Sequence, residues 1–369
     1  MNIGIAGAGL IGRLLAWQLL RRGHKITLFD RDAAAGELSA ARVAAAMLAP
    51  YSEAVHSERA IFDWGRESLA LWPALLHDLK IDSDIDVFFQ HQGSVVVAHA
   101  NDRSSLDHFN KCLLHAVPDF SDSIQPLDKN SLQELEPELA ERFSAATFLR
   151  EEGTLDNREL LLALEQAIRC AGALWYEGSE VTKVDAGAIY FDNEIFHCDL
   201  AIDTRGFGAK KQLADLRGVR GEVLWVHAPE VHFTRPIRLM HPRYQLYIAP
   251  KRDSVYVIGA TEIESESLAP ISVRSSLELQ SALYSTHTGF AEANVLHAYA
   301  NCRPAFMDNL PRVEISDGLM RVNGLFRHGY LLSPVVMAQA LAAIEGRVEH
   351  SIVKYIDAVN YSSTKSVCA

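Results

Sequence analysis

Three glycines near the start of the chain have the spacing of a nucleotide-binding turn. Gly7, Gly9 and Gly12 form a GxGxxG pattern, and Asp30 follows about 20 residues later. The first glycine permits a tight turn, the second lets the backbone approach a pyrophosphate, and the third lets the next helix pack closely on the strand. An acidic residue at this distance accepts hydrogen bonds from ribose hydroxyls and disfavours a 2′-phosphate. The pattern therefore predicts a site for FAD or NAD and argues against NADP.

The segments on either side of these glycines are the ones that such a turn needs. The run before Gly7 is short and apolar, which fits a buried parallel strand. Leucines recur at helical spacing over residues 10–22, and Gly23 stands where a helix C-cap is expected. Residues 25–29 fit a second strand that ends beside Asp30. Strand, glycine turn, helix and strand together form the unit that holds a dinucleotide.

The composition indicates a globular, acidic protein. Its 369 residues, 49% of them hydrophobic, are enough for one large domain or two interleaved domains. A formal net charge of -12 argues against nonspecific binding to nucleic acid or acidic lipid. The five cysteines are scattered, so we expect neither a disulfide framework nor a zinc site. There is no signal-peptide pattern and no apolar run of about 18 residues, so we expect a cytoplasmic protein without a membrane span.

Helical and strand patterns alternate along the rest of the chain. Residues 57–79 predict an amphipathic helix, and residues 151–169 contain another that begins near Asp156 or Asn157. Alternating β-branched residues predict strands over residues 87–100, with a turn at Gly93.

Further strands are expected after the second helix. Residues 173–197 predict a three-stranded meander with strands over residues 173–176, 181–190 and 194–197, and an apolar strand ends at Asp203. Residues 244–260 predict an antiparallel hairpin around a KRDS turn. The chain therefore leaves the nucleotide-binding region, returns to it and leaves it again.

Two segments could lie against a flat cofactor. Residues 39–50 are rich in alanine, and they fit either a tightly packed helix turn or a loop along the cofactor with Met47 as an apolar contact. Near the C-terminus, Ser333 is an N-cap candidate and Pro334 fits the first helical position before a strongly apolar helix. The N-terminus of that helix would favour negative charge.

Several stretches in matching order resemble the D-amino-acid oxidase family of FAD enzymes, and within it the bacterial glycine oxidases of thiamine biosynthesis. They are GIAGAGLIG with AAAMLAP, then YIAPKRDSVYVIGATE, then NCRPAF and GLFRHGYLLSPVVMAQAL. The resemblance covers essentially the whole chain and implies FAD rather than NAD.

The order of the segments, taken with this resemblance, implies an α/β fold with two interleaved domains. A Rossmann-like FAD-binding domain would contain residues 1–80, 141–218 and 301–369. A substrate-binding domain of α+β type, built on an antiparallel sheet, would contain residues 81–140 and 219–300.

The resemblance assigns the substrate end of the site to three residues. Arg303 matches an arginine, just before a proline, that binds the substrate carboxylate in family members. Tyr247 matches a tyrosine that helps to hold the same carboxylate, and Arg327 matches an arginine near the flavin edge. A guanidinium suits this role because it binds a carboxylate through two parallel hydrogen bonds. The structural alternatives are a salt bridge for Arg303, a core position for Tyr247, and a surface or supporting position for Arg327.

The resemblance also implies which residues contact FAD. These are Gly7, Gly9, Leu10, Ile11, Gly12, Asp30, Arg31, Ala45, Ala46, Met47, Val181, Thr204, Gly206, Arg327, His328, Gly329, Tyr330 and Leu331. Cys302 is expected to be a buried thiol, so the FAD is expected to be non-covalent. His328 is expected to be a hydrogen-bonded structural group rather than a base. The chain departs from the family at Arg205, where relatives often have a small residue.

The implied reaction is the oxidative deamination of glycine or a related small amino acid, such as sarcosine or a small D-amino acid. Hydride would pass from the substrate Cα to the flavin after the ammonium has lost a proton, so no protein base is required. Dioxygen would become hydrogen peroxide, and the imine would serve thiazole and thiamine biosynthesis.

Two alternatives remain open. One is a dehydrogenase that passes electrons to a quinone or a protein, and the other is a flavoprotein without catalysis. We expect no nucleic-acid partner. The exposed edges of the strand-rich domain are compatible with a homo-oligomer.

Overall fold

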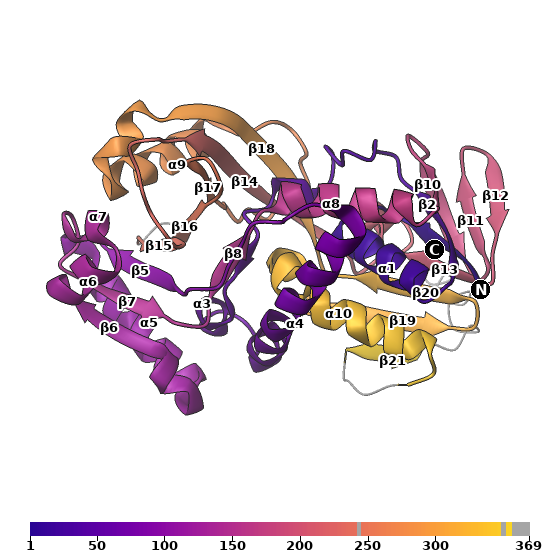
Figure 1. Cartoon of the computed structure of the whole chain (residues 1–369), viewed down its shortest axis with the longest axis horizontal. Coiled ribbons are helices and arrows are strands. Elements are labelled where there is room, and N and C mark those ends of the chain that lie inside the picture. Colours follow the sequence, from indigo (N-terminus) through magenta and orange to yellow (C-terminus); the bar gives the residue numbers. More distant parts are fainter. Residues whose placement is uncertain (242–244, 348–351, 356–369) are drawn as a thin grey trace, which may run out of the picture.

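The glycine-turn segment contributes two strands to a seven-stranded sheet (Figure 1). This computed structural model describes residues 1–241, 245–347 and 352–355. Strand β1 (Asn2–Ala6) lies between β2 (Lys25–Phe29) and β13 (Leu200–Asp203) and is parallel to both. The sheet order is β21-β19-β20-β13-β1-β2-β9, in which the remaining strands are β9 (Leu174–Tyr176), β19 (Arg312–Ser316), β20 (Leu319–Asn323) and β21 (Val353–Tyr355).

Four helices cover one face of this sheet. Ile3 and Ile5 of β1 are fully buried in the same apolar cluster as these helices. The helices, which pack against one another, are α1 (Leu10–Arg21), α4 (Arg59–Ser83), α8 (Asn157–Cys170) and α10 (Gly329–Ile344). Helices α4 and α8 confirm the two expected helices, and Asp156 caps α8 by accepting hydrogen bonds from the N–H groups of Arg158 and Glu159. Among the described residues, no helix has the length and apolar character that a membrane span requires.

A small meander covers the opposite face. A Cβ at Gly4 of β1 would lie 2.7 Å from the side chain of Ile189, so this glycine allows the meander to pack closely. The meander contains β10 (Val181–Asp185), β11 (Ala188–Phe191) and β12 (Glu194–His197). The expected meander over residues 173–197 was partly wrong, because β9 pairs with β2 instead. The expected strand from Val181 to Tyr190 is also broken, since the chain turns at Gly187 with a φ of 67°.

A second sheet has eight strands and lies to the left in Figure 1. Its order is β18 (Asn294–Ala305), β14 (Arg217–His227), β17 (Val255–Gly259), β16 (Gln245–Pro250), β15 (Ile237–Met240), β5 (Ser94–Ala98), β7 (Ala145–Leu149) and β6 (Ile124–Asp128). Neighbours are antiparallel except β15 and β5, which are parallel. The expected hairpin forms β16 and β17, although its start at residue 244 lies outside the described residues.

Short elements join the two sheets. Strands β3 (Met47–Leu48), β8 (Gly153–Leu155) and β4 (Phe89–Gln90) form a three-stranded sheet, and helices α2 (Ala40–Val43) and α3 (Pro50–Ala54) flank β3 in the chain. Strands were expected on both sides of Gly93, and β4 and β5 confirm them. These two strands do not pair with each other but belong to different sheets.

Helix α10 begins five residues earlier than the sequence predicted. Ser333 and Pro334 lie inside the helix, which starts at Gly329. Pro334 has no N–H for the carbonyl of Tyr330, one helical turn before it. The indole Nε1 of Trp72 donates to that carbonyl at 3.2 Å, so the proline leaves no unsatisfied acceptor. A neighbouring helix therefore makes an interior proline tolerable.

Some strands do not follow the segment boundaries proposed from the sequence. Strand β7 falls within residues 141–218 but pairs with β5 and β6 in the eight-stranded sheet. Strand β18 runs across residue 301. The division into segments stays a prediction.

Candidate active site

A cavity of about 1350 Å³ extends from the glycine turn to the eight-stranded sheet. Every site residue predicted from the sequence lines it except Gly12. Because β1 is parallel to both neighbours, its turn lies at the same sheet edge as Asp30, which follows β2, and Thr204, which follows β13. This is the topological switch point at which doubly wound sheets bind nucleotides.

Each of the three glycines is needed at its position for a different structural reason. Gly7 has a φ of 96°, and a Cβ there would lie 2.7 Å from the backbone of Arg205. A Cβ at Gly12 would lie 1.9 Å from the carbonyl oxygen of Gly7, so Gly12 allows the turn and α1 to approach each other. A Cβ at Gly9 would meet only the hydroxyl of Ser39, at 3.6 Å. Gly9 instead lines the cavity, where a ligand can approach its backbone.

Two helix N-termini open into the cavity. Gly9 is the N-cap of α1, which has no side-chain cap and no acidic residue in its first turn. Gly329 begins α10, which also lacks a side-chain cap, and Gly329 and Tyr330 line the cavity. Free N–H groups at a helix N-terminus favour a bound anion. These features fit the pyrophosphate and ring system of a dinucleotide.

Acidic and hydroxyl side chains fix the turn. The Asp30 carboxylate accepts hydrogen bonds from the N–H groups of Ala8 at 2.5 Å and Asp32 at 2.9 Å. Thr204 Oγ1 donates to the carbonyl of Gly7 at 2.7 Å. Asp30 also lines the cavity, so its carboxylate lies at the nucleotide end of the site.

Arg205, the departure from the family pattern, has a structural role in this chain. Its guanidinium pairs with Asp203 at 2.7 Å and donates to the carbonyl of Val181 at 3.0 Å. The residue therefore ties the end of β13 to β10.

The alanine-rich segment meets the cavity through helix α2, the short loop after it and the start of β3. Helix α2 ends at Val43, and Ala45, Ala46 and Met47 line the cavity. Lys251 was not selected from the sequence, because it belongs to the charged KRDS turn, which looked solvated. The residue is nevertheless only 7% exposed. Its ammonium donates to the carbonyl of Ala45 at 2.9 Å, and burial lowers its pKa to about 8. Lys251 thus stabilises the backbone of this loop.

Arg303 lies on β18 and faces the cavity. Its Nη1 donates to the carbonyl of Thr261 at 3.1 Å and to that of Arg220 at 3.5 Å. It forms no ion pair with any residue that the structure describes, so the salt-bridge alternative is not supported. Burial holds the pKa of Arg303 below its usual range. The neighbouring Cys302 is 1% exposed, as expected for a buried thiol.

Arg327 has different surroundings. Its Nε donates to Glu53 at 2.7 Å and its Nη1 to Glu262 at 2.9 Å. Burial opposes the charge, but these two carboxylates hold the pKa of Arg327 above its usual range. No sequence pattern pointed to Glu53 or Glu262, because α3 and the segment after β17 supply them from distant positions.

Tyr247 lies on β16 and lines the cavity rather than the core. Its hydroxyl accepts a hydrogen bond from Nη1 of Arg238 at 3.3 Å, and burial raises its pKa. Arg238, another residue that the sequence analysis missed, is 3% exposed and also donates to the carbonyl of Ser52 at 2.8 Å. Behind Ser52 is the buried Glu152, which accepts hydrogen bonds from Ser52 and Ser94. Burial raises the pKa of Glu152 to about 7.

His328 is buried between α3 and α10. Its Nδ1 lies 3.4 Å from the carboxylate of Glu53, and its Nε2 lies 3.4 Å from the hydroxyl of Ser57. Burial lowers its pKa to about 4. The imidazole is therefore neutral at pH 7.

Comparison with known proteins identifies the family. A family model described as FAD dependent oxidoreductase matches residues 2–344. The chain belongs to this family. The cavity residues fit that cofactor, because both helix N-termini and the glycine turn offer backbone N–H groups to its anionic parts. The protein is therefore an FAD-dependent oxidoreductase, as the sequence predicted.

Individual relatives lie within the same family. The putative thiamine biosynthesis oxidoreductase ThiO of Rhizobium etli is 36% identical over 352 residues, which cover 95% of this chain and 99% of that protein. Glycine oxidase of Geobacillus kaustophilus is 26% identical over 348 residues, 90% of each chain. The crystal structure of glycine oxidase from that organism superposes with a TM-score of 0.83, at 23% identity, and covers 100% of this chain and 99% of its own. The structural match confirms the fold.

Proposed function

We propose that this enzyme oxidises glycine or a closely related small amino acid, such as sarcosine or a small D-amino acid. In the balanced reaction, glycine, dioxygen and water give glyoxylate, ammonia and hydrogen peroxide. The observation that carries the proposal is Arg303, a cavity-facing guanidinium without an ion pair among the described residues. Tyr247 lines the same cavity, whose opposite end is the glycine turn.

FAD would be held mainly by backbone groups. The glycine turn and the N-terminus of α1 would bind the pyrophosphate, and Asp30 would accept hydrogen bonds from the adenosine ribose. Bound FAD supplies the two-electron acceptor for the substrate Cα–H bond and the route from there to dioxygen. The N-terminus of α10 would stabilise negative charge at the other end of the cofactor.

The substrate would be oriented by its carboxylate. Arg303 would bind both carboxylate oxygens, and Tyr247, whose raised pKa keeps its hydroxyl protonated, would donate a further hydrogen bond. Orientation of the Cα–H bond is the main demand on the protein, because no side chain has to take up its hydrogen. The substrate amine would lose its proton to solvent. Two nitrogens of Arg327 are already bound to the carboxylates of Glu53 and Glu262, so Arg327 would hold this side of the site in position.

The cellular role that we propose is supply of an imine for thiazole and thiamine biosynthesis, in the cytoplasm. The names of the relatives support the pathway, and the four described cysteines, all free thiols, are compatible with a reducing compartment. A homo-oligomer stays a prediction, which the molar mass in solution would test.

An anaerobic reduction screen tests the proposal. Purified protein with bound FAD is mixed with glycine, sarcosine and paired D- and L-amino acids, and the loss of flavin absorbance is followed. Glycine or another small amine is expected to bleach the flavin, and air should then yield one hydrogen peroxide per imine. Flavin that stays oxidised with all of them would contradict the substrate class. Reduction without peroxide would indicate a dehydrogenase.

A further inference from the structure

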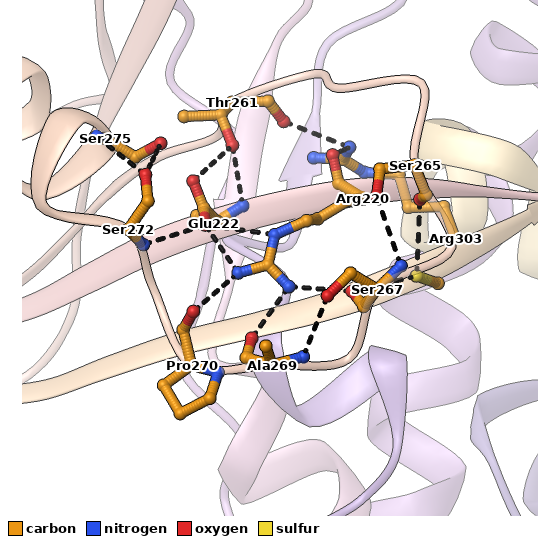
Figure 2. Close-up of polar contacts among 11 residues, drawn as sticks. Arg220, Glu222, Thr261, Ser265, Ser267, Ala269, Pro270, Ser272, Ser275 and Arg303 are labelled. Carbon is orange, nitrogen blue, oxygen red and sulfur yellow. Dashed lines mark hydrogen bonds and ion pairs between the residues drawn. The ribbon is translucent and has the colours of Figure 1, made fainter.

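Behind Arg303 lies a buried ion pair that the reaction described above does not use. Arg220 and Glu222 on β14 are 6% and 0% exposed, and their side chains approach to 2.6 Å (Figure 2). A buried ion pair by itself is weak support for stability, because desolvation offsets the attraction between the charges. Its bonding partners suggest a different purpose.

Arg220 holds the loop of residues 261–272, which joins β17 to α9 (Val273–Thr286). Its guanidinium donates to the carbonyls of Ser267 at 2.7 Å, Ala269 at 2.7 Å and Pro270 at 2.8 Å, as Figure 2 shows. The backbone of Arg220 also exchanges hydrogen bonds with that of Ile263. One residue of the sheet therefore fixes most of this loop.

Glu222 holds the first residue of the loop, Thr261. The N–H of Glu222 donates to Thr261 Oγ1 at 3.0 Å, and that hydroxyl donates to the Glu222 carboxylate at 3.4 Å. The N–H of Thr261 donates in turn to the carbonyl of Glu222 at 3.2 Å. The carbonyl of Thr261, thus fixed, is the nearer acceptor for Arg303, at 3.1 Å.

Gly221, between the two charged residues, leaves the space that the Arg303 guanidinium occupies. A Cβ at Gly221 would lie 2.3 Å from Nη2 and 2.4 Å from Cζ of Arg303. The backbone of Gly221 does not have a positive φ, so alanine could adopt it. Glycine here therefore serves the position of the arginine side chain rather than a turn.

We propose that Arg220, Gly221, Glu222 and Thr261, here called the positioning cluster, orient Arg303 toward the substrate carboxylate. This inference rests on the proposed function of Arg303. The cluster binds Nη1 through neutral carbonyl oxygens, so it fixes the guanidinium without neutralising its charge. The other nitrogens stay available for a carboxylate. A pre-oriented guanidinium loses less side-chain freedom when the substrate binds.

The cluster also reaches the second arginine of the site. Glu262, next to Thr261 in the loop, binds Arg327 at 2.9 Å. Both site arginines thus depend on the placement of one loop, which Arg220 anchors to β14.

The test uses two substitutions that leave the buried ion pair intact, Gly221→Ala and Thr261→Val. Acetate, a carboxylate without an amine, is titrated into the FAD-loaded enzyme, and its dissociation constant is read from the flavin spectrum. Gly221→Ala is expected to weaken acetate and raise the KM for glycine by about tenfold or more, with a smaller change in kcat. Thr261→Val should act in the same direction, because its hydroxyl link to Glu222 is lost.

Two matched variants and Arg303→Ala complete the experiment. Thr261→Ser keeps the hydroxyl, and Ser267→Ala removes a hydroxyl of the same loop that the cluster does not use, so both should bind acetate within about twofold of the parent. Parental acetate affinity in both Gly221→Ala and Thr261→Val, with affinity lost in Arg303→Ala, would overturn the positioning role alone. Parental affinity in Arg303→Ala would instead overturn the proposed function of Arg303.

Discussion

The two ends of the cavity are built in different ways. At the nucleotide end, Gly7, Gly9, Gly12 and Asp30 come from one continuous segment, and they act through backbone geometry and a single carboxylate. At the substrate end, Tyr247 and Arg303 come from two strands of the eight-stranded sheet, and Arg327 comes from a short 3-10 helix that follows β20. A local pattern can therefore specify the first end, whereas the second depends on which distant residues become neighbours.

The largest effect that this comparison predicts is at the glycine turn. Gly12→Ala would place a Cβ 1.9 Å from the carbonyl oxygen of Gly7, so backbone must move. We expect a loss of about 3 kcal/mol or more in the free energy of unfolding, together with loss of bound FAD. Denaturant unfolding and the flavin absorbance of the purified protein measure the two effects.

The matched variant at this end is Gly9→Ala. Its Cβ fits the apoprotein, so the free energy of unfolding without FAD should stay near that of the parent. The affinity for FAD should fall by about tenfold or more, because the methyl group enters the space for the pyrophosphate. Equal FAD affinity in Gly9→Ala and the parent would contradict the placement of the nucleotide at this turn.

A smaller effect is expected when Arg327 is replaced, and it distinguishes the roles of the two site arginines. Arg327→Ala leaves the Glu53 carboxylate, 13% exposed, without its main partner. We expect the free energy of unfolding to fall by about 3 kcal/mol, as when one partner of a buried ion pair is removed. Within the part of the chain that the structure describes, Arg303 has no such partner, so Arg303→Ala should lose substrate affinity with a smaller loss of stability. Thermal unfolding of both variants without substrate checks this difference, and equal losses would contradict it.

The smallest effect concerns Glu152, whose carboxyl lies behind the Ser52 and Arg238 contacts of Tyr247. Its pKa is about 7 in the folded protein, above the unfolded value, so the folded state holds the proton more tightly. The stability that this provides is lost as the pH rises through 7. Between pH 6 and 8.5 the loss should be about 1.4 kcal/mol.

Glu152→Gln isolates this contribution. The pKa of His328 is lowered to about 4, so its contribution to the free energy of unfolding rises over the same pH range. This contribution is the same in both proteins and cancels in the comparison. The parent should therefore lose more stability than Glu152→Gln as the pH rises from 6 to 8.5. Parallel curves of unfolding free energy against pH would show that Glu152 does not titrate in this range.

The sequence predicted the fold where local patterns carry it. The glycine turn, the strand before Asp30, helices α4 and α8 and the hairpin of β16 and β17 follow from periodicity, caps and turn residues. The start of α10 was wrong because a tertiary hydrogen bond from Trp72 accommodates Pro334. The meander was partly wrong because strand pairing, and not strand propensity, decided the sheet of β9.

The same distinction applies to the candidate site, of which the sequence predicted one part and not the other. The resemblance to a family located Arg303, Tyr247 and Arg327, and all three line the cavity. It gave no sign of their partners, such as Glu53 of Arg327 and Arg238 of Tyr247, because these side chains meet the site only through pairing of distant strands and loops. Charged residues of this kind look like ordinary surface charges in a sequence, and only burial distinguishes them.

The most direct test of the account is the anaerobic reduction of bound FAD by glycine in the parent, Arg303→Ala and Arg252→Ala. Arg252 is a matched control, since its exposed guanidinium pairs with Asp86 outside the cavity. Loss of a hydrogen-bonded charge partner costs about 2 to 5 kcal/mol, so Arg303→Ala should raise the glycine concentration for half-maximal reduction roughly 30-fold to several thousandfold. Arg252→Ala should match the parent. The same glycine dependence in Arg303→Ala and the parent would contradict the account.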